Sequence, residues 1–368
     1  MTQVRVLSIL NGSTLRPPER NRQARGVNAA LLLTGLAGLV ILVAGFSMTA
    51  GASDASAGAV IMHWFGLGAQ AVNDRDLLII EAIRLPRIVL GLLVGAALAV
   101  SGVLMQGIFR NPLADPGLAG VSAAASLGAA TVIVLGSSLA LPVTSLLGLL
   151  SLPVAAFFSS LAVTVLLYAL ATRNGRTSVP VMLLAGVAIA ALAFAVTGFL
   201  VQMADDRQLR DLSFWQLGSL GGVDWPKIAV LAAIMALAFS TLPVLGPALN
   251  ALALGEAAAH HMGVPVERVK RLAIVVVSAV TGASVALSGG IGFVGIVVPH
   301  ILRLAIGPDH RLLLPASALL GGALLVLADT FARTIVAPAE LPIGIVTALA
   351  GSPFFLWLLI HKRSVLDG

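Results

Sequence analysis

Apolar runs of about the length that crosses a bilayer recur along the whole chain, with short polar breaks between them. Leu85–Phe109 and Val179–Met203 are two clear examples. Hydrophobic residues make up 58% of the 368 residues and charged residues only 10%, which leaves too little polar surface for a soluble protein of this size. The runs are rich in Gly, Ala, Leu and Val, which suits helices rather than barrel strands. The sequence therefore predicts an all-α membrane protein that crosses the bilayer many times.

The polar breaks divide the chain into ten expected transmembrane helices. Their expected bounds are Val27–Thr49, Leu85–Phe109, Pro116–Leu135, Leu141–Ala171, Val179–Met203, Trp225–Pro247, Leu272–Leu287, Phe293–Ala305, Leu312–Phe331 and Leu341–Ile360. Loops are expected over 50–83 and 204–224, the second with a short helix. This predicts one transmembrane domain over 26–361, between a basic tail at 1–25 and a short tail at 362–368. A signal peptide is the alternative for the first helix, but the apolar region is too long for one.

Lysine and arginine are distributed unequally between the two sides that ten helices define. With a cytoplasmic N-terminus, 15 of the 22 basic residues lie on the cytoplasmic side. The other seven are Arg75, Arg84, Arg87, Arg207, Arg210, Lys227 and Arg333. This bias predicts that both termini are cytoplasmic. It also accounts for the net charge of +6 without a nucleic-acid partner.

The stretch 250–271 is the longest polar interruption in the second half of the chain. Its first part has helical composition, Gly263 and Pro265 then break it, and it ends in basic residues. On the cytoplasmic side, a short rigid helix between two transmembrane helices suits docking to a soluble partner better than binding a small molecule. An ordinary solvated loop is the alternative interpretation.

Charged residues also mark the outer ends of two expected helices. Arg84 and Arg87 lie at the start of the second helix, and Arg333 follows Asp329 by four residues, a spacing that suits an ion pair within a helix. We expect the three guanidinium groups to gather on one outer face, where they would suit carboxylates of a soluble partner. The alternatives are membrane-interface anchors for the first two arginines and a proton relay for Asp329.

The sequence shows no catalytic constellation inside an expected helix. Without cysteine, disulfides, thiolate metal sites and cysteine nucleophiles are excluded. Gly290–Gly295 matches GxGxxG, but it joins two apolar runs outside any βαβ unit, so we interpret its glycines as permitting a tight turn and close helix approach. His260 and His261 are adjacent, a spacing that makes them a poor metal-binding pair, and we predict no metal site.

Three long segments of the chain resemble FecCD-type permeases, the membrane subunits of ABC importers for vitamin B12, iron–siderophores and haem. They are RLPRIVLGLLVGAALAVSGVLMQGIFRNPLADPGLAGVSAAASLGAA (Arg84–Ala130), GGIGFVGIVVPHILRLAIGPDHRLLLP (Gly289–Pro315) and ADTFARTIVAPAELPIGIVTALAGSPFF (Ala328–Phe355). The segment ALALGEAAAHHMGV, which begins at Ala251, resembles the coupling helix of that family. The resemblance covers about residues 60–361, in the right order.

The resemblance implies the fold of a type II ABC importer permease, similar to the vitamin B12 permease, with ten transmembrane helices per subunit. It implies a homodimer in the bacterial inner membrane, in contact with lipid. Two ABC ATPase subunits would bind ATP and Mg on the cytoplasmic side, and a periplasmic binding protein would dock outside. The chain itself has no GxxxxGK[ST] sequence and would not be an enzyme, so the separate ATPase would hydrolyse ATP.

The resemblance also assigns roles to three groups of residues. The ATPase-coupling group is Leu254, Gly255, Glu256 and Ala257. The binding-protein docking group is Arg84, Arg87 and Arg333. The fifth helix and the short helix near Phe214 would form the translocation pathway and its gate, with Phe214 and Trp215 on the short helix. Gln106, a polar exception within the second expected helix, is also expected to belong to the pathway. No cofactor is expected to be bound covalently.

The transported substrate is expected to be haem, because SFWQLGSLGGVDW (Ser213–Trp225) together with RNPLADPGLAGVS looks most like haem-importer permeases. Iron–siderophores and vitamin B12 are the alternatives within the family. An ion-coupled secondary transporter is the alternative from another class, although paired intramembrane acids and internal repeats, which such transporters often have, are not evident. An intramembrane enzyme would need a catalytic constellation that the sequence does not show.

Overall fold

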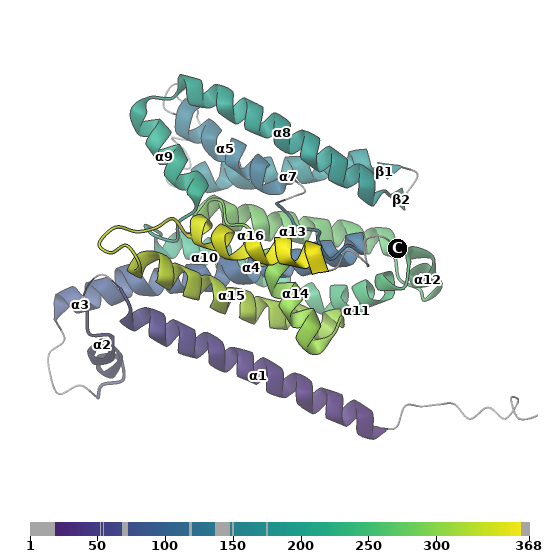
Figure 1. The fold of residues 1–368 in the computed structure, drawn as a ribbon, viewed down its shortest axis with the longest axis horizontal. Coiled ribbons are helices and arrows are strands. Elements are labelled where there is room, and N and C mark those ends of the chain that lie inside the picture. The colour runs from purple at the N-terminus through teal and green to yellow at the C-terminus, as the bar shows by residue number, and fades with distance from the viewer. Residues whose placement is uncertain are drawn as a thin grey trace, which may run out of the picture.

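The structure, a computed structural model, describes residues 19–361 apart from 52, 54, 68–72, 118–119, 137–147, 149–150 and 174–175. Its helices form an elongated bundle with α12 at one end and α2 and α3 at the other (Figure 1). The helices of the first half are α1 (Glu19–Thr49), α2 (Ala57–Trp64), α3 (Asp74–Leu78), the π-helix η1 (Ile79–Arg84), α4 (Leu85–Phe109), α5 (Val121–Leu135) and α7 (Ser151–Ala171). Those of the second half are α8 (Val179–Met203), α9 (Asp206–Leu217), α10 (Trp225–Phe239), α11 (Leu242–Ala253), α12 (Glu256–His261), α13 (Val266–Ser288), α14 (Val294–Ile306), α15 (His310–Thr334) and α16 (Ile343–His361). Two-residue strands β1 (Thr172–Arg173) and β2 (Arg176–Thr177) pair antiparallel between α7 and α8.

Six helices in the described part of the chain are long and apolar enough to cross a membrane. They are Ala29–Thr49, Asp74–Phe109, Ser151–Ala171, Pro180–Met203, Val266–Ser288 and His310–Thr334. The bent pair α10 and α11 is a seventh candidate, and α5, α14 and α16 are shorter apolar helices. The all-α membrane fold is confirmed, and the helix count roughly matches the ten predicted.

Two predicted segments differ from the structure. Trp225–Pro247 was expected to be one helix, but α10 and α11 are bent by 50° at a break after Phe239. Pro243, which has no backbone N–H to donate, lies at the start of α11 and favours this break. The predicted loop 50–83 contains two helices, and η1 runs directly into α4. Part of the predicted helix Leu141–Ala171 and the two tails 1–18 and 362–368 lie outside the described residues.

Helix α4 occupies the centre of the bundle and is buried along most of its length. Glycines on α4 allow neighbouring backbones to approach it closely. A Cβ atom at Gly95 would collide with the backbone of Gly321 on α15, and one at Gly102 would collide with the backbone carbonyl of Gly295 on α14. Gly295 ends the GxGxxG match, so this close contact agrees with a packing role for that motif.

Helices α5, α7 and α8 form a separate layer on one side of the bundle, together with α9 (Figure 1). This layer meets the rest of the bundle mainly through α13. A Cβ atom at Gly282 on α13 would collide with the hydroxyl of Ser160, which places α7 tightly against the middle of α13. The outward side of α8 carries exposed apolar residues, as expected for a surface that faces lipid or another subunit.

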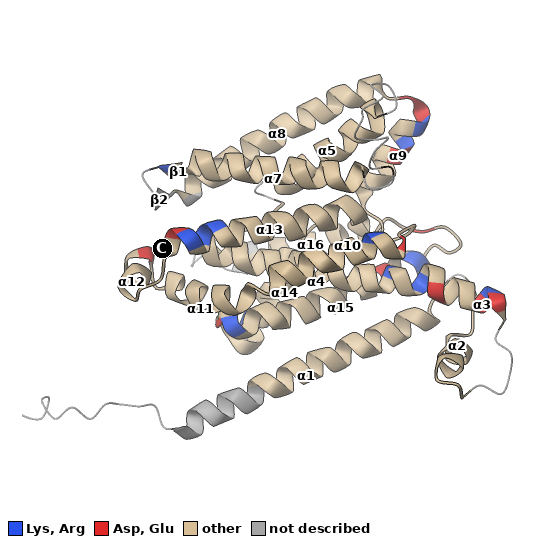
Figure 2. Ribbon diagram, turned by 180° about the vertical axis from the view of Figure 1, so that it is seen from behind, with Lys and Arg blue, Asp and Glu red and all other residues tan. Residues whose placement is uncertain are grey.

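Charged residues gather at the two ends of the bundle and leave its middle almost free of them (Figure 2). The end with α12 is called the coupling end below, and the end with α2, α3 and η1 is called the arginine end. The described part of α1 begins at the coupling end, where α16 also finishes (Figure 1). Both ends of the described chain therefore lie on one side, as the predicted topology requires.

Candidate functional site

The coupling end presents a short helix between two long ones. Gly255 precedes α12 with a φ of 109°, a backbone conformation that L side chains rarely adopt, so the chain can turn sharply out of α11 there. Glu256 is the first residue of α12. Leu254, which belongs to the same predicted ATPase-coupling group, is 71% exposed. Ala257 is exposed as well. The structure thus brings the four predicted ATPase-coupling residues together on a projecting turn.

A polar cleft of about 880 Å³ lies beside α12. Its walls come from the end of α4, from α12 and from the start of α13. They include Arg110, Glu256, His260, Glu267 and Arg271. Charged side chains of both signs line the cleft, whereas small-molecule pockets are lined mainly by hydrophobic and aromatic side chains.

Hydrogen bonds hold α11, which leads into this projection, to the start of α15. The Asn250 amide donates to Asp309 Oδ1 at 2.6 Å, and the amide oxygen of Asn250 accepts from the backbone N–H of His310 at 2.9 Å. Asp309 also accepts from the backbone N–H of Arg311 at 3.0 Å and so caps α15. Burial tends to raise the pKa of Asp309, but these hydrogen bonds and the nearby positive charge of Arg311 hold it below its ordinary value.

This cap predicts a pH-dependent stability. A carboxyl group with a lowered folded-state pKa stabilises the fold above its unfolded pKa of about 4, and this contribution disappears as pH falls through the lowered value. We expect Asp309→Asn to lower the thermal unfolding midpoint at pH 7. The difference from the wild type should shrink towards zero below pH of about 4. A midpoint difference that stays constant from pH 7 to pH 3 would contradict this assignment.

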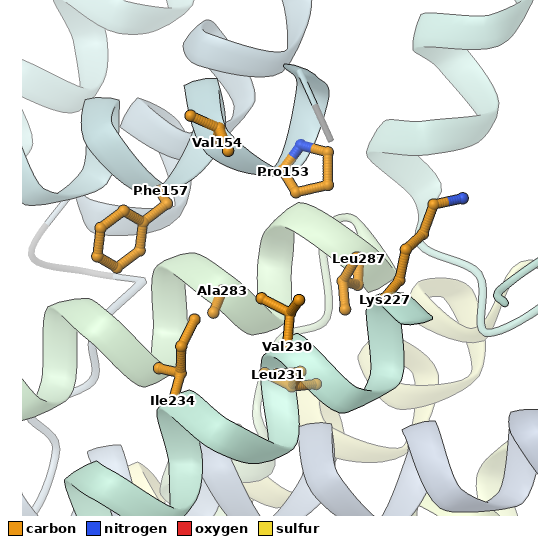
Figure 3. A pocket seen from close by; sticks show the side chains of 9 residues that line it. All are labelled: Pro153, Val154, Phe157, Lys227, Val230, Leu231, Ile234, Ala283 and Leu287. Atoms are coloured by element: carbon orange, nitrogen blue, oxygen red, sulfur yellow. The ribbon is translucent and has the colours of Figure 1, made fainter. Parts of the chain in front are cut away.

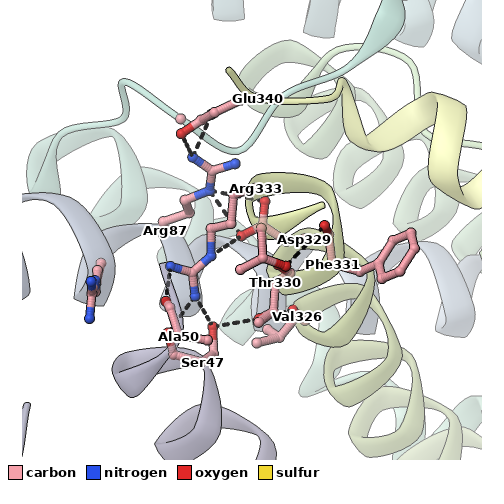
Figure 4. Close-up of polar contacts among 12 residues, drawn as sticks. Ser47, Ala50, Arg87, Val326, Asp329, Thr330, Phe331, Arg333 and Glu340 are labelled. Carbon is pink, nitrogen blue, oxygen red and sulfur yellow. Dashed lines mark hydrogen bonds and ion pairs between the residues drawn. The ribbon is translucent and has the colours of Figure 1, made fainter. Parts of the chain in front are cut away.

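At the arginine end, a buried cluster of ion pairs joins α4 to α15 (Figure 4). Arg87 Nε lies 2.9 Å from both carboxylate oxygens of Asp329. Its Nη1 atom donates to both oxygens of Glu340, at 2.9 and 2.8 Å. Arg333 lies farther from Asp329, with Nε 3.6 Å from Oδ2. The predicted pairing of Asp329 with Arg333 is therefore present, but Arg87 is the closer partner.

Arg84 and Arg333 donate hydrogen bonds to backbone carbonyl groups at the end of α1 and just after it. Arg333 donates to the backbone carbonyls of Ser47 and Ala50, and Arg84 donates to those of Met48 and Ser53. The last carbonyls of a helix have no partner within it and carry its negative dipole end, so two guanidinium groups stabilise it there. The three predicted docking arginines are thus brought together, but the structure buries them and turns them inward instead of exposing a ring.

The predicted pathway residues lie apart. Gln106, close to the coupling end of α4, is buried and donates to the carbonyl of Gly295 at 3.0 Å, which ties α4 to α14. Phe214 and Trp215 are on α9, nearer the opposite end (Figure 1). Phe214 is 65% exposed. The buried Nε1 atom of Trp215 has no hydrogen-bond partner among the described residues.

Sequence reasoning missed Glu340 and Lys270. Glu340 is an isolated acid in a short loop, and only its position close to the end of an arginine-bearing helix could have indicated a partner. Lys270 was counted as one of several cytoplasmic cations, yet it is 1% exposed and its Nζ atom lies 2.8 Å from Glu256. Within the described ranges, no group of three or more His, Asp or Glu residues has the geometry to hold a metal ion.

Comparison with known proteins agrees with this architecture. The chain is 46% identical to the hemin transport system permease protein HmuU of Yersinia pestis, over 85% of this chain and 92% of that protein. It is 47% identical to the cobalamin import system permease protein BtuC of Halobacterium salinarum, over 79% of this chain and 76% of that protein. Its fold is similar to a solved metal-chelate type ABC transporter in an inward-facing conformation, with a TM-score of 0.75 and 31% identity over 91% of this chain and 99% of that one. Residues 38–361 match the FecCD transport family, and the chain belongs to this family.

Proposed function

We propose that this FecCD-family ABC importer permease carries haem across the bacterial inner membrane, from a periplasmic haem-binding protein to the cytoplasm. The observation that carries the haem assignment is the 46% identity to a hemin permease over 92% of that permease. The bundle provides the apolar segments that such a passage needs, with a polar projection at one end and a charged cluster at the other. The relative that imports cobalamin makes vitamin B12 the second candidate.

The proposed partners follow from the two ends. Two ATPase subunits, which bind ATP and Mg, would receive the projection of Leu254, Gly255, Glu256 and Ala257 from each copy of a homodimer. Leu254 is 71% exposed, so its side chain offers apolar surface that the ATPase would bury. Both termini would be cytoplasmic, with a basic tail at 1–25 and a second tail at 362–368. Gln106, Phe214 and Trp215 are proposed to belong to the translocation pathway and its gate.

The test of this function is transport by a reconstituted complex. The chain would be placed in liposomes with its cognate ABC ATPase. Its binding protein would be added empty, with haem, with vitamin B12 or with a ferric siderophore. Haem-stimulated ATP hydrolysis with haem appearing on the far side is the expected result. Stimulation by vitamin B12 or a siderophore alone would replace haem as the substrate. Failure to assemble with any ATPase would overturn the importer role.

The arginine end is proposed to dock the binding protein through Arg84, Arg87 and Arg333. In the structure, Glu340 pairs with the Nη1 atom of Arg87, and the side chain of Glu340 is 53% exposed. A carboxylate of the binding protein would take the position of Glu340, since both need the same guanidinium group. Arg87 would keep its contact with Asp329 during this exchange.

This exchange predicts an unusual result for Glu340→Gln. Removing the competing carboxylate should tighten the binding protein by up to about fivefold, the range expected for losing one partly exposed ion pair. Binding to the permease in nanodiscs would measure it at low and at physiological salt. Glu81→Gln is the matched control, because Glu81 accepts from Trp64 and lies at the same end. Equal tightening in both variants, or weaker binding in Glu340→Gln, would contradict the exchange.

A further inference from the structure

At the coupling end, the buried Lys270 belongs to a set of polar contacts that connects α12, α13 and α7. Lys270 on α13 lies with Nζ 2.8 Å from Glu256 Oε1 on α12 and 3.4 Å from Glu267 Oε1 on its own helix. The other oxygen of Glu267, Oε2, accepts from the Tyr168 hydroxyl on α7 at 2.9 Å. A continuous set of polar contacts therefore runs from the projecting helix through α13 to α7.

The burial of Lys270 makes these contacts difficult to break. Its side chain is 2% exposed, so water cannot replace a carboxylate that moves away. Loss of its closer carboxylate partner is unfavourable for a buried ammonium group, and Glu267 at 3.4 Å compensates the charge only in part. Glu256 is itself partly exposed and lies at the start of α12, where a partner would push. A displacement of α12 is for this reason expected to carry Lys270 and α13 with it.

The layer that contains α7 is fixed to α13 unevenly. Tyr168 anchors it at the coupling end, and the contact between Ser160 and Gly282 anchors its middle. Towards the arginine end, an apolar crevice of about 140 Å³ separates α7 from α10 and α13 (Figure 3). Its lining includes Val154 and Phe157 on α7, Val230 and Ile234 on α10, and Leu287 on α13. A space of this kind offers α7 room to tilt, whereas a tightly packed seam would not.

We propose that Lys270, with Glu256, Glu267 and Tyr168, is a transmission node that converts displacement of α12 into tilting of α7 about its contact with α13. The tilt narrows or widens the crevice at the far end of the same helix. Lys270 is thus a positioning residue that acts between the coupling helix and the layer of α5, α7 and α8. This inference rests on the proposed importer function, because ATP binding by the partner is what displaces α12.

The experiment compares Lys270→Met and Tyr168→Phe with the wild type in the reconstituted complex. Lys270→Met removes the ammonium group but keeps an unbranched chain, and Tyr168→Phe removes one hydroxyl only. We expect transport per ATP hydrolysed to fall at least about fivefold in Lys270→Met, the scale of a lost coupling between sites, and by less in Tyr168→Phe. Arg75→Met is the control, because Arg75 is an exposed basic residue on α3 at the opposite end and does not line the crevice.

A second readout follows the crevice itself. The chain has no cysteine, so a cysteine pair at Val154 and Val230 gives cross-linking without background. In the otherwise unchanged complex, the cross-linking rate should differ between ATP-bound and nucleotide-free states. In the Tyr168→Phe background, which is the mildest change, this difference should shrink. If the difference in cross-linking rate between the two nucleotide states is as large in Lys270→Met and Tyr168→Phe as in the wild type, the transmission role is wrong.

The proposed importer function and the proposed transmission role can be refuted separately. If the wild-type complex does not transport any substrate or does not bind an ATPase, the importer function fails first. If the wild type transports and both variants keep its ratio of substrate moved to ATP hydrolysed, only the transmission node fails. Should Lys270→Met not fold, Tyr168→Phe and the cross-linking rate still decide the question.

Discussion

Gly102→Ala is expected to lower the stability of the folded permease more than any other substitution considered. A single Cβ atom at this position would occupy the space of the Gly295 carbonyl, and both groups belong to backbones that are fixed in packed helices. Overpacking a core with side chains that can move costs about 1–3 kcal/mol. Here a backbone must shift, so we expect a loss of at least about 3 kcal/mol. Thermal unfolding in detergent, followed by size-exclusion chromatography, would measure it.

Gly35→Ala is the matched control for this change. Gly35 lies on α1, and a Cβ atom there would meet nothing within 4 Å. Alanine is the better helix former by about 0.5–1 kcal/mol, so this variant should be as stable as the wild type or slightly more stable. If Gly102→Ala unfolds at the same temperature as Gly35→Ala, α4 and α14 are not packed as the structure has them.

Asp329→Asn is expected to have the second-largest effect. The substitution keeps the shape of the side chain and removes its charge, which leaves Arg87 and Arg333 buried with less compensation. Removing one partner of a buried ion pair typically costs about 3–5 kcal/mol. The partly exposed Glu340 can compensate only the outer side of Arg87. We therefore expect a fall in the unfolding temperature that high salt does not reverse, because the pair is buried.

Asp224→Asn tests whether the loss comes from burial. Asp224 pairs with Lys227 at 3.1 Å, but its side chain is 47% exposed. Exposed pairs contribute about 1 kcal/mol or less, so this variant should unfold close to the wild-type temperature. Similar losses in both variants would indicate that net charge at the arginine end matters more than the geometry of the buried cluster.

The helices could largely be predicted because a lipid environment leaves the backbone few choices. A segment that crosses the bilayer must satisfy its own N–H and C=O groups, so an apolar run of the right length becomes a helix. Val179–Met203 was predicted with the bounds that the structure gives to α8. The break between α10 and α11 was missed although Ser240, Thr241 and Pro243 mark it in the sequence, because the residues on both sides are apolar and the two helices together have the length of one transmembrane segment.

The partners of the charged groups could be predicted only when they were close in sequence. The spacing of Asp329 and Arg333 suggested their pair, but Arg87 is 242 residues from Asp329 and holds it more closely. Arg84 binds backbone carbonyls of α1, and a backbone carbonyl has no signature in a sequence. The docking hypothesis accordingly placed the three arginines on one face, but did not foresee that their own helices would already engage them.

The hydrogen bonds from Arg84 and Arg333 to the carbonyl groups at the end of α1 connect this helix to α15, which lies in the last quarter of the sequence. During synthesis, the carbonyls that end α1 emerge long before Arg333 does, and domains form from the N-terminus onwards. The carbonyl groups at the end of α1 consequently lack the contacts with Arg333 until α15 has been synthesised. A chain that stops short of α15 lacks Arg333 and cannot make these contacts at the end of α1.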